Sequence, residues 1–192
     1  MQNKHASILK SVELAMLAAL SVVLMLLVRF PLIPSAAFLE YDMGDIPVLI
    51  ATFLFGIVPG FAVLLVESLI QAITVSAASG WVGFVMHVCS SGVFLLIAGL
   101  IYKKMKSIKG LIIGLIAGSL AMTLIMIPLN LIFTVHFLGS PRDAVIDMLL
   151  PAIIPFNLFK AVLNSAVAGL LFVPLKQILS KTKLLPQIKE NK

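Results

Sequence analysis

The sequence predicts an all-α integral membrane protein with six transmembrane helices and both termini in the cytoplasm, forming a single membrane domain over residues 1–192. Three observations predict this class. The 192 residues are 61% hydrophobic and only 11% charged. The mean hydropathy is +1.16, which no water-soluble domain of this length approaches. The apolar residues also form six segments separated by short polar connections.

The six expected spans follow one another closely along the chain. The first ends at the proline-rich turn Pro31-Leu-Ile-Pro34, and the second is expected to stop at Pro59-Gly60. The second and third fall short of the ~20 residues that a straight crossing needs, so they would tilt or form a broken hairpin. Pro128 is expected to kink the fifth. The expected spans cover about residues 8–30, 46–58, 60–76, 82–102, 110–138 and 148–179.

The basic residues predict the orientation. Only Arg29 and Arg142 fall on outward segments if the N-terminus lies inside, and Lys160 lies within a span. By the positive-inside rule this distribution places both termini in the cytoplasm. The remaining basic residues are all cytoplasmic in this arrangement: Lys4, Lys10, Lys103, Lys104, Lys106, Lys109, Lys176, Lys181, Lys183, Lys189 and Lys192.

Composition also excludes several classes of protein. The net charge of +6 is too segregated for a basic groove, so no nucleic-acid partner is expected. Cys89 is the single cysteine, which excludes a structural disulfide. The first apolar segment is too long for a signal peptide, and we expect none. A phosphate-binding loop is absent, so any ATP chemistry must come from a partner.

A polar stripe inside the sixth span is the strongest candidate site. Lys160 lies near its centre, with Asn157 one turn before and Asn164 one turn after, on the same helix face. A lysine at the centre of a span costs roughly 2.5–3.5 kcal/mol on insertion scales, so it must face protein, water or a ligand. We expect a functional site. The alternative is a lysine satisfied by a neighbouring carbonyl or carboxylate, with the asparagines as interhelical hydrogen-bonding groups.

Asn130 and Thr134 add a second polar pair on the fifth span. They are four residues apart, and an amide, which donates and accepts at once, suits a flat heteroaromatic or polyhydroxyl ligand. Interhelical hydrogen bonding explains Asn130 equally well. Trp81 and Phe84 could stack on a planar ligand, although a tryptophan at a span end is also typical of a membrane-interface anchor.

The first outward loop is the third candidate. Phe38 and Tyr41 could stack on a ligand, while the carboxylates of this loop, Glu40, Asp42 and Asp45, could accept hydrogen bonds from hydroxyl groups or pair with Lys160. Such a loop would act as a lid over a cavity in the membrane. An ordinary solvated loop with aromatic side chains at headgroup level is the alternative.

Two further features, the Glu67 and His87 side chains and the series of small residues, are expected to be structural. Glu67 on the third span is expected to be a hydrogen-bonded structural carboxylate, and His87 lacks neighbours at metal-ligand spacing, so no metal site is expected. Small residues indicate close helix packing. They form one series on the first span, Ala15, Ala18 and Ala19, and one on the fifth, Gly110, Gly114 and Gly118, for which internal packing is the default.

Three motifs together resemble the riboflavin-specific S components of energy-coupling factor (ECF) transporters. The resemblance covers essentially the whole chain. The loop and helix 6 motifs are fairly specific, whereas the alanine pair alone is not. The motifs are Leu39-Glu-Tyr-Asp-Met-Gly-Asp-Ile-Pro-Val-Leu49 with Phe55-Gly-Ile-Val-Pro-Gly60, then Pro155-Phe-Asn-Leu-Phe-Lys160, and Ala15-Met-Leu-Ala-Ala19.

The resemblance implies a monomeric subunit in the bacterial plasma membrane that captures riboflavin from outside and is not an enzyme. It would work with a transmembrane T component and two ATPases, hold no cofactor, and dock on the T component through the alanine face. By the same resemblance Glu40 and Asp45 lie at or near the pocket, and Glu67 has no family role. The implied ligand contacts on the helices are Asn130, Asn157, Lys160 and Asn164.

Two alternatives stay open at this point. Within transport, the chain would be an S component for another vitamin, such as thiamine, biotin or pantothenate. Outside transport, it would be a small membrane enzyme or assembly factor that uses Glu67 and His87. Those two residues would then be essential and Lys160 dispensable.

Overall fold

The computed structural model describes residues 2–36 and 38–181, which form a helical bundle with one short β-ribbon. The helices are α1 (Gln2–Leu27), α2 (Asp45–Phe55), α3 (Ile57–Ile73), α4 (Gly80–Met105), α5 (Ile108–Leu129), α6 (Arg142–Met148) and α7 (Ile154–Lys181). The shorter elements are β1 (Arg29–Pro31), the 3₁₀ turn η1 (Pro34–Ala36), β2 (Glu40–Asp42), and the π-helical turns η2 (Asn130–Thr134) and η3 (Leu149–Ile153).

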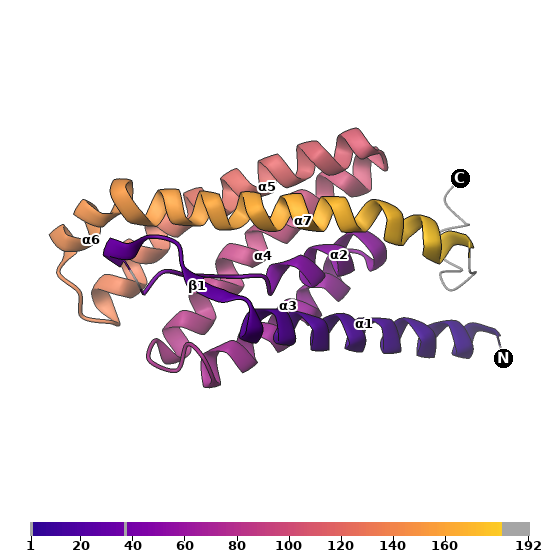
Figure 1. Cartoon of the computed structure of the whole chain (residues 1–192), viewed down its shortest axis with the longest axis horizontal. Coiled ribbons are helices and arrows are strands. Elements are labelled where there is room, and N and C mark those ends of the chain that lie inside the picture. The colour runs from indigo at the N-terminus through magenta and orange to yellow at the C-terminus, as the bar shows by residue number, and fades with distance from the viewer. Residues whose placement is uncertain (1, 37, 182–192) are drawn as a thin grey trace.

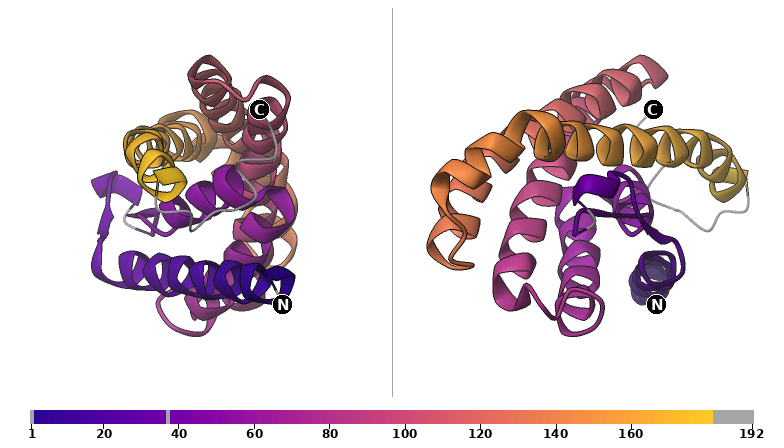
Figure 2. Two further views of the ribbon diagram at one scale, coloured as in Figure 1. Left: turned by 90° about the vertical axis from the view of Figure 1, so that its right-hand side faces the viewer. Right: turned by 60° about the vertical axis from the view of Figure 1, so that its left-hand side comes forward.

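α2 occupies the centre of the bundle. Nine of its eleven residues are buried, and it packs against α1, α3, α4 and α7. Around it, α1 packs on α3, α3 on α4, α4 on α5, and α5 on α7. Figure 2 shows the long helices arranged about this short segment. A helix surrounded in this way is expected to be apolar on nearly all sides, because almost no face of α2 contacts water or lipid.

Within the part of the chain that the structure describes, four helical segments are long and apolar enough to cross a membrane: Ser7–Leu27, Gly80–Met105, Ile108–Thr134 and Arg142–Lys181. α2 and α3 are shorter apolar helices, as the sequence indicated. Each expected span therefore has a helix, while six crossings and cytoplasmic termini stay predictions. The start of α1, the end of α7 and the α4–α5 turn lie at one end of the molecule (Figure 1). The tail lysines Lys183, Lys189 and Lys192 lie outside the described residues.

The expected break at Pro59-Gly60 is wrong, because the chain turns at Gly56. Gly56 has a φ of 102°, which favours glycine, and α3 begins at the next residue. Pro59 then falls in the first turn of α3, where its missing N–H group is not needed. Gly60 packs directly on Thr52 of α2, and a Cβ there would collide with the threonine side chain. The two short helices thus form a tight hairpin.

The first loop is more ordered than the sequence predicts. α1 ends at Leu27 rather than near Phe30, and β1 pairs with β2 in an antiparallel ribbon. The register places Phe30 opposite Tyr41, and Arg29 forms an ion pair with Glu40. The residues of β2 that follow Glu40 are buried. The ribbon therefore turns Tyr41 and Asp42 into the protein.

The glycines of α5 pack against α4, which confirms their expected internal role. A Cβ at Gly114 would lie 2.8 Å from the carbonyl oxygen of Ala98, and one at Gly118 would lie 2.9 Å from that of Phe94. The α-helix continues through Pro128 to Leu129 and then changes to the π-helical turn η2. The loop expected before the sixth span is instead helical, since α6, η3 and α7 form one segment, Arg142–Lys181.

Candidate functional site

Lys160 forms a buried ion pair with Asp42. The Nζ atom of Lys160 on α7 lies 2.6 Å from Oδ2 of Asp42 on β2, although the two residues are 118 positions apart. The N–H of Gly44 donates to Oδ1 of Asp42 at 3.0 Å, and Gln71 Nε2 lies 3.4 Å from Oδ2. A buried charge of either sign requires such partners. The expected pairing of Lys160 with a carboxylate of the first loop is therefore present, through Asp42.

Asn164 of α7 forms hydrogen bonds to two residues of β2. Its Oδ1 accepts a hydrogen bond of 2.9 Å from the Tyr41 hydroxyl, and its Nδ2 donates to the backbone oxygen of Asp42 at 3.3 Å. Tyr41 is 1% exposed, and its ring centroid lies 5.3 Å from that of Phe30. We call Tyr41, Asp42, Lys160 and Asn164 the paired cluster. Its members hold the first loop against the sixth expected span.

The electrostatics of Asp42 follow from these contacts. Burial by itself raises the pKa of the Asp42 carboxyl, but the charge and hydrogen bond of Lys160, the charge of His87 and the N–H of Gly44 outweigh burial. The pKa of Asp42 consequently lies below its ordinary value. The carboxylate is ionised, and it balances the lysine charge.

A second group of buried polar side chains lies beside the first. His87 Nε2 on α4 lies 3.1 Å from Glu67 Oε2 on α3 and 3.6 Å from Asp45 Oδ1 at the start of α2. We call Asp45, Glu67, His87 and Ser91 the acid–histidine cluster. Four members of the cluster have buried polar atoms without a hydrogen-bond partner among the described residues: both carboxylate oxygens of Asp45, Oε1 of Glu67, Nε2 of His87 and Oγ of Ser91. This cluster has spare capacity to accept hydrogen bonds.

Gly44 lies between the two clusters, against Asp42 of β2 and Glu67 of α3. A Cβ at Gly44 would lie 2.6 Å from Glu67 Oε1 and 3.1 Å from Asp42 Oδ1. The Gly44 carbonyl oxygen accepts a hydrogen bond of 2.6 Å from Ser21 of α1. Only glycine leaves room for both carboxylates at this point. The loop can therefore bring Asp42 close to Glu67 of α3 without a side chain between the two carboxylates.

The remaining predicted amides bond mainly within their own helices. Asn157 Nδ2 donates to the carbonyl oxygen of Ile153, and Asn130 Nδ2 donates to that of Met126, both at 2.8 Å. Thr134 donates to Oδ1 of Asn130 at 3.1 Å. The hydrogen bond of Asn157 among the described residues is made by Nδ2 and leaves Oδ1 without a donor. Asn157 thus keeps an acceptor available beside the paired cluster.

The structure does not place the other predicted residues in either cluster. Glu40 pairs with Arg29, so it is not the counter-ion of Lys160. Phe38 is 67% exposed and Trp81 is 56% exposed, while Phe84 is half-buried. The Trp81 ring lies 5.1 Å from that of Phe137 and 6.3 Å from that of Phe133 on η2, between ring centroids. Trp81, Phe133 and Phe137 thus form a separate aromatic group near the end of α5.

Sequence reasoning counted Asp42 among the loop carboxylates that could pair with Lys160 but did not select it as a site residue, and it expected no neighbour at metal-ligand spacing for His87. Strand alternation would have placed Tyr41 and Asp42 on opposite faces, whereas both are buried, so this pattern gave no signal for Asp42. Nothing in the sequence selected Asp42 over Glu40 or Asp45. Among the described residues, no three His, Cys, Asp or Glu side chains are arranged to hold a metal ion.

The alanine series lies on the outside of α1. Ala15 and Ala19 are exposed, whereas Ala18 packs against the core. Neighbouring positions on this helix also expose large apolar side chains, including Met16 and Leu20. An apolar helix face of this kind contacts lipid or another membrane helix.

Comparison with known sequences gives consistent matches. The family model described as "ECF transporter, substrate-specific component" matches residues 9–172. The chain is 33% identical over 175 residues to the riboflavin transporter FmnP of Bacillus subtilis, covering 87% of this chain and 92% of that protein. It is 32% identical over 189 residues to the riboflavin transporter RibU of Staphylococcus aureus, covering 94% of each.

Comparison with solved structures agrees. A structure described as the S component of a bacterial ECF transporter superimposes with a TM-score of 0.75 at 34% sequence identity. The match covers 93% of this chain and 99% of that one. Sequence and fold therefore point to the same group of proteins.

Proposed function

The chain belongs to the substrate-specific components of ECF transporters, and we propose that it is the subunit that captures riboflavin from outside the cell. It is a multi-pass protein of the bacterial plasma membrane. Two curated relatives named riboflavin transporters, each at least 32% identical over most of the chain, support this substrate. Delivery inward would require a T component and two ATPase subunits.

The single observation that carries the binding proposal is the buried Lys160–Asp42 pair with unsatisfied polar atoms beside it. Riboflavin joins a flat apolar ring, edged with donors and acceptors, to a neutral polyhydroxyl chain. A pocket for such a molecule needs apolar walls and a few convergent polar groups. The two clusters supply donors on one side and acceptors on the other.

Lys160 and Asn157 suit the polar edge of the ring. A lysine ammonium group has three N–H donors, and the hydrogen bond to Asp42 uses one of them. Lys160 would donate to a ring carbonyl or a ribityl oxygen, while Asn157 Oδ1 would accept from a ring N–H. Asn164 and Asn130 would contribute from their neighbouring positions on α7 and η2.

The acid–histidine cluster suits the hydroxyl groups of the ligand. Asp45 lies at the start of α2, where the helix dipole favours a negative charge, yet neither of its oxygens has a donor among the described residues. Each ribityl hydroxyl can donate one hydrogen bond. We assign Asp45 the role of accepting one of them, because this removes the cost of a buried unpaired oxygen.

The exposed face of α1 would dock on the T component. Ala15 and Ala19 present little bulk, which allows a partner helix to approach closely. α1 packs on α2 and α3, so this face lies on the opposite side of the bundle from α5 (Figure 2). Ligand capture and assembly would thus use separate surfaces of one monomeric subunit.

The test is the visible absorption spectrum of the detergent-purified protein, followed by riboflavin titration with fluorescence quenching. Near-stoichiometric bound flavin or tight quenching is the expected result. Thiamine, biotin and pantothenate serve as competitors and should leave the quenching unchanged. A colourless protein that quenches nothing, or quenching relieved by one of the other vitamins, would reject riboflavin as the substrate.

The enzyme alternative is tested with substitutions on the same protein. Glu67 and His87 do meet, at 3.1 Å, so this alternative makes a definite claim about them. A transport subunit should lose cellular riboflavin uptake when Lys160 is replaced by methionine. Uptake that survives this change but fails with His87→Gln would favour chemistry at Glu67 and His87 instead.

A further inference from the structure

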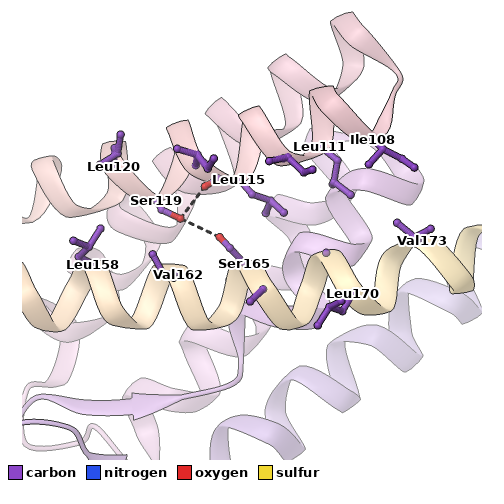
Figure 3. Close-up of a pocket in the computed structure, with 14 residues that line it drawn as sticks. Ile108, Leu111, Leu115, Ser119, Leu120, Leu158, Val162, Ser165, Leu170 and Val173 are labelled. Atoms are coloured by element: carbon purple, nitrogen blue, oxygen red, sulfur yellow. Dashed lines mark hydrogen bonds between the residues drawn. The ribbon is translucent and has the colours of Figure 1, made fainter.

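A long groove lies between α5 and α7, on the outside of the bundle. It has a volume of about 540 Å³ and runs along both helices (Figure 3). Its wall is almost wholly aliphatic. The side chains that line it include Ile112, Leu115, Ile116, Leu158, Val162 and Ala166.

The few polar atoms in the groove are already bonded. Ser119 Oγ donates to the carbonyl oxygen of Leu115 at 2.8 Å and lies 3.0 Å from Ser165 Oγ (Figure 3). Gly169 keeps the floor open, since a Cβ there would lie 3.3 Å from Leu115 Cδ1. An occupant of the groove therefore meets hydrocarbon and needs to be apolar itself.

A smaller pocket of about 280 Å³ continues the groove at one end and is basic. The two cavities share Ile108, Leu111 and Val173, and the smaller one adds Lys106 and Lys176. No residue that lines either cavity is acidic.

The positive charges of these two lysines are not balanced by carboxylates of the described residues. Neither Lys106 nor Lys176 pairs with a described carboxylate. Lys176 Nζ donates to the Tyr102 hydroxyl at 2.8 Å and lies 5.5 Å from the centroid of that ring. This contact orients the ammonium group at the mouth of the groove but does not neutralise it.

We propose that this groove binds an anionic phospholipid, with one acyl chain between α5 and α7 and the headgroup phosphate on Lys106 and Lys176. The length of the groove matches the hydrocarbon thickness of one membrane leaflet. From Ile108 to Leu120 the helix rises about 18 Å at 1.5 Å per residue, against roughly 15 Å for half of a hydrocarbon core. The charge fits the cytoplasmic leaflet, where anionic lipids gather, given the orientation expected from the basic residues.

The proposed docking face leaves this groove free. α1 packs on α2 and α3, whereas the groove lies between α5 and α7, across the bundle. A lipid could thus stay bound while the subunit associates with its transport partners. The site does not depend on flavin binding, and its test has no flavin readout.

Native mass spectrometry of the detergent-purified full chain tests the proposal. The protein is titrated with phosphatidylglycerol and, separately, with phosphatidylcholine carrying the same acyl chains. We expect one phosphatidylglycerol to bind at least tenfold more tightly than phosphatidylcholine. Equal binding of the two lipids would overturn the headgroup assignment, and a mass of two protein chains without lipid would assign the groove to a second copy.

Matched variants locate the site. Lys106→Gln with Lys176→Gln should remove the preference for phosphatidylglycerol, whereas Lys104→Gln with Lys181→Gln, which changes the charge equally outside the groove, should keep it. Ala166→Phe should fill the groove and weaken both lipids, while Leu163→Phe on the same helix should not. Unchanged helical circular dichroism shows that each variant is folded. Undiminished lipid preference in the first double variant would overturn the proposal.

Discussion

Asp42 and Asp45 stand three residues apart, and both are buried, yet their surroundings differ. Asp42 bonds to Lys160, Gly44 and Gln71, so both of its oxygens have donors. Neither oxygen of Asp45 has a hydrogen-bond partner among the described residues, and its nearest charge is His87 at 3.6 Å. The acceptors of Asp42 are satisfied within the protein, whereas those of Asp45 are not.

This difference indicates that the two clusters have different roles, one in holding the fold and one in binding the ligand. A satisfied ion pair between β2 and α7 fixes the first loop in place, and it keeps a lysine inside an apolar helix. Unsatisfied acceptors cost free energy unless a donor arrives, and a polyhydroxyl ligand brings several. We therefore expect changes in the paired cluster to affect folding and binding together. A change at Asp45, neither of whose oxygens has a hydrogen-bond donor among the described residues, should affect binding more than folding.

The largest effect is expected for Lys160→Met. It leaves Asp42 charged and buried, so the free energy of unfolding should fall by roughly 3–5 kcal/mol and riboflavin binding should be lost. Thermal unfolding in detergent and flavin titration measure the two effects. The double variant Lys160→Met with Asp42→Asn should regain most of the stability without regaining binding. A stable single variant that binds normally would contradict both roles of Lys160.

Asp45→Asn should separate binding from stability. The change keeps the shape of the side chain and removes a charge that no donor satisfies, so the unfolding temperature should stay constant or rise. Riboflavin affinity should fall about tenfold, or 1.4 kcal/mol, because one of the two acceptor oxygens is replaced by an NH2 group and the remaining oxygen carries no formal charge. Asp42→Asn is the matched comparison and should lose stability. If the two variants behave alike, the distinction between the clusters fails.

Asn157→Ala should weaken riboflavin binding by tenfold or more, since it removes the free Oδ1 acceptor beside Lys160. Its stability cost should be only about 1 kcal/mol, the loss of the hydrogen bond to Ile153. Isothermal titration and thermal unfolding give both quantities. Leu163→Ala, which truncates an exposed side chain of the same helix, is the control. Unchanged affinity would remove Asn157 from the site.

Acid should weaken the paired cluster gradually. The pKa of Asp42 is lower in the folded protein, so its ionised form stabilises the fold fully above the unfolded value of about 3.9. This stabilisation is lost as the pH falls through the lower, folded pKa. The difference in unfolding temperature between wild type and Asp42→Asn should therefore shrink below pH ~4. A difference that stays constant with pH would show that the charge of Asp42 contributes nothing.

The smallest effect on riboflavin binding is expected for Ala15→Trp, which lies outside both clusters. The bulky ring should leave flavin affinity unchanged but prevent close approach of a partner helix. Co-purification with the T component and ATPases measures assembly. Leu124→Trp, on the exposed face of α5, should assemble normally. Retained assembly in the Ala15 variant would exclude this face as the docking surface.

The sequence alone determined the class of protein and singled out the polar stripe around Lys160 as a candidate site. Six apolar segments, the short second and third helices, and the stripe around Lys160 all follow from composition and helical periodicity. These properties are local, because the bilayer fixes how long and how apolar a span must be. A charge inside such a segment then requires a partner wherever the chain supplies one.

Only the tertiary structure decided which partner that is. Glu40, Asp42 and Asp45 carry the same charge within six residues, and the β1–β2 ribbon sends Glu40 to Arg29 and Asp42 to Lys160. The meeting of Glu67 with His87 depends in the same way on how α3 packs against α4. Ion pairs form at distances of a few ångströms, and spacing along the chain does not set such distances between segments that meet only after folding.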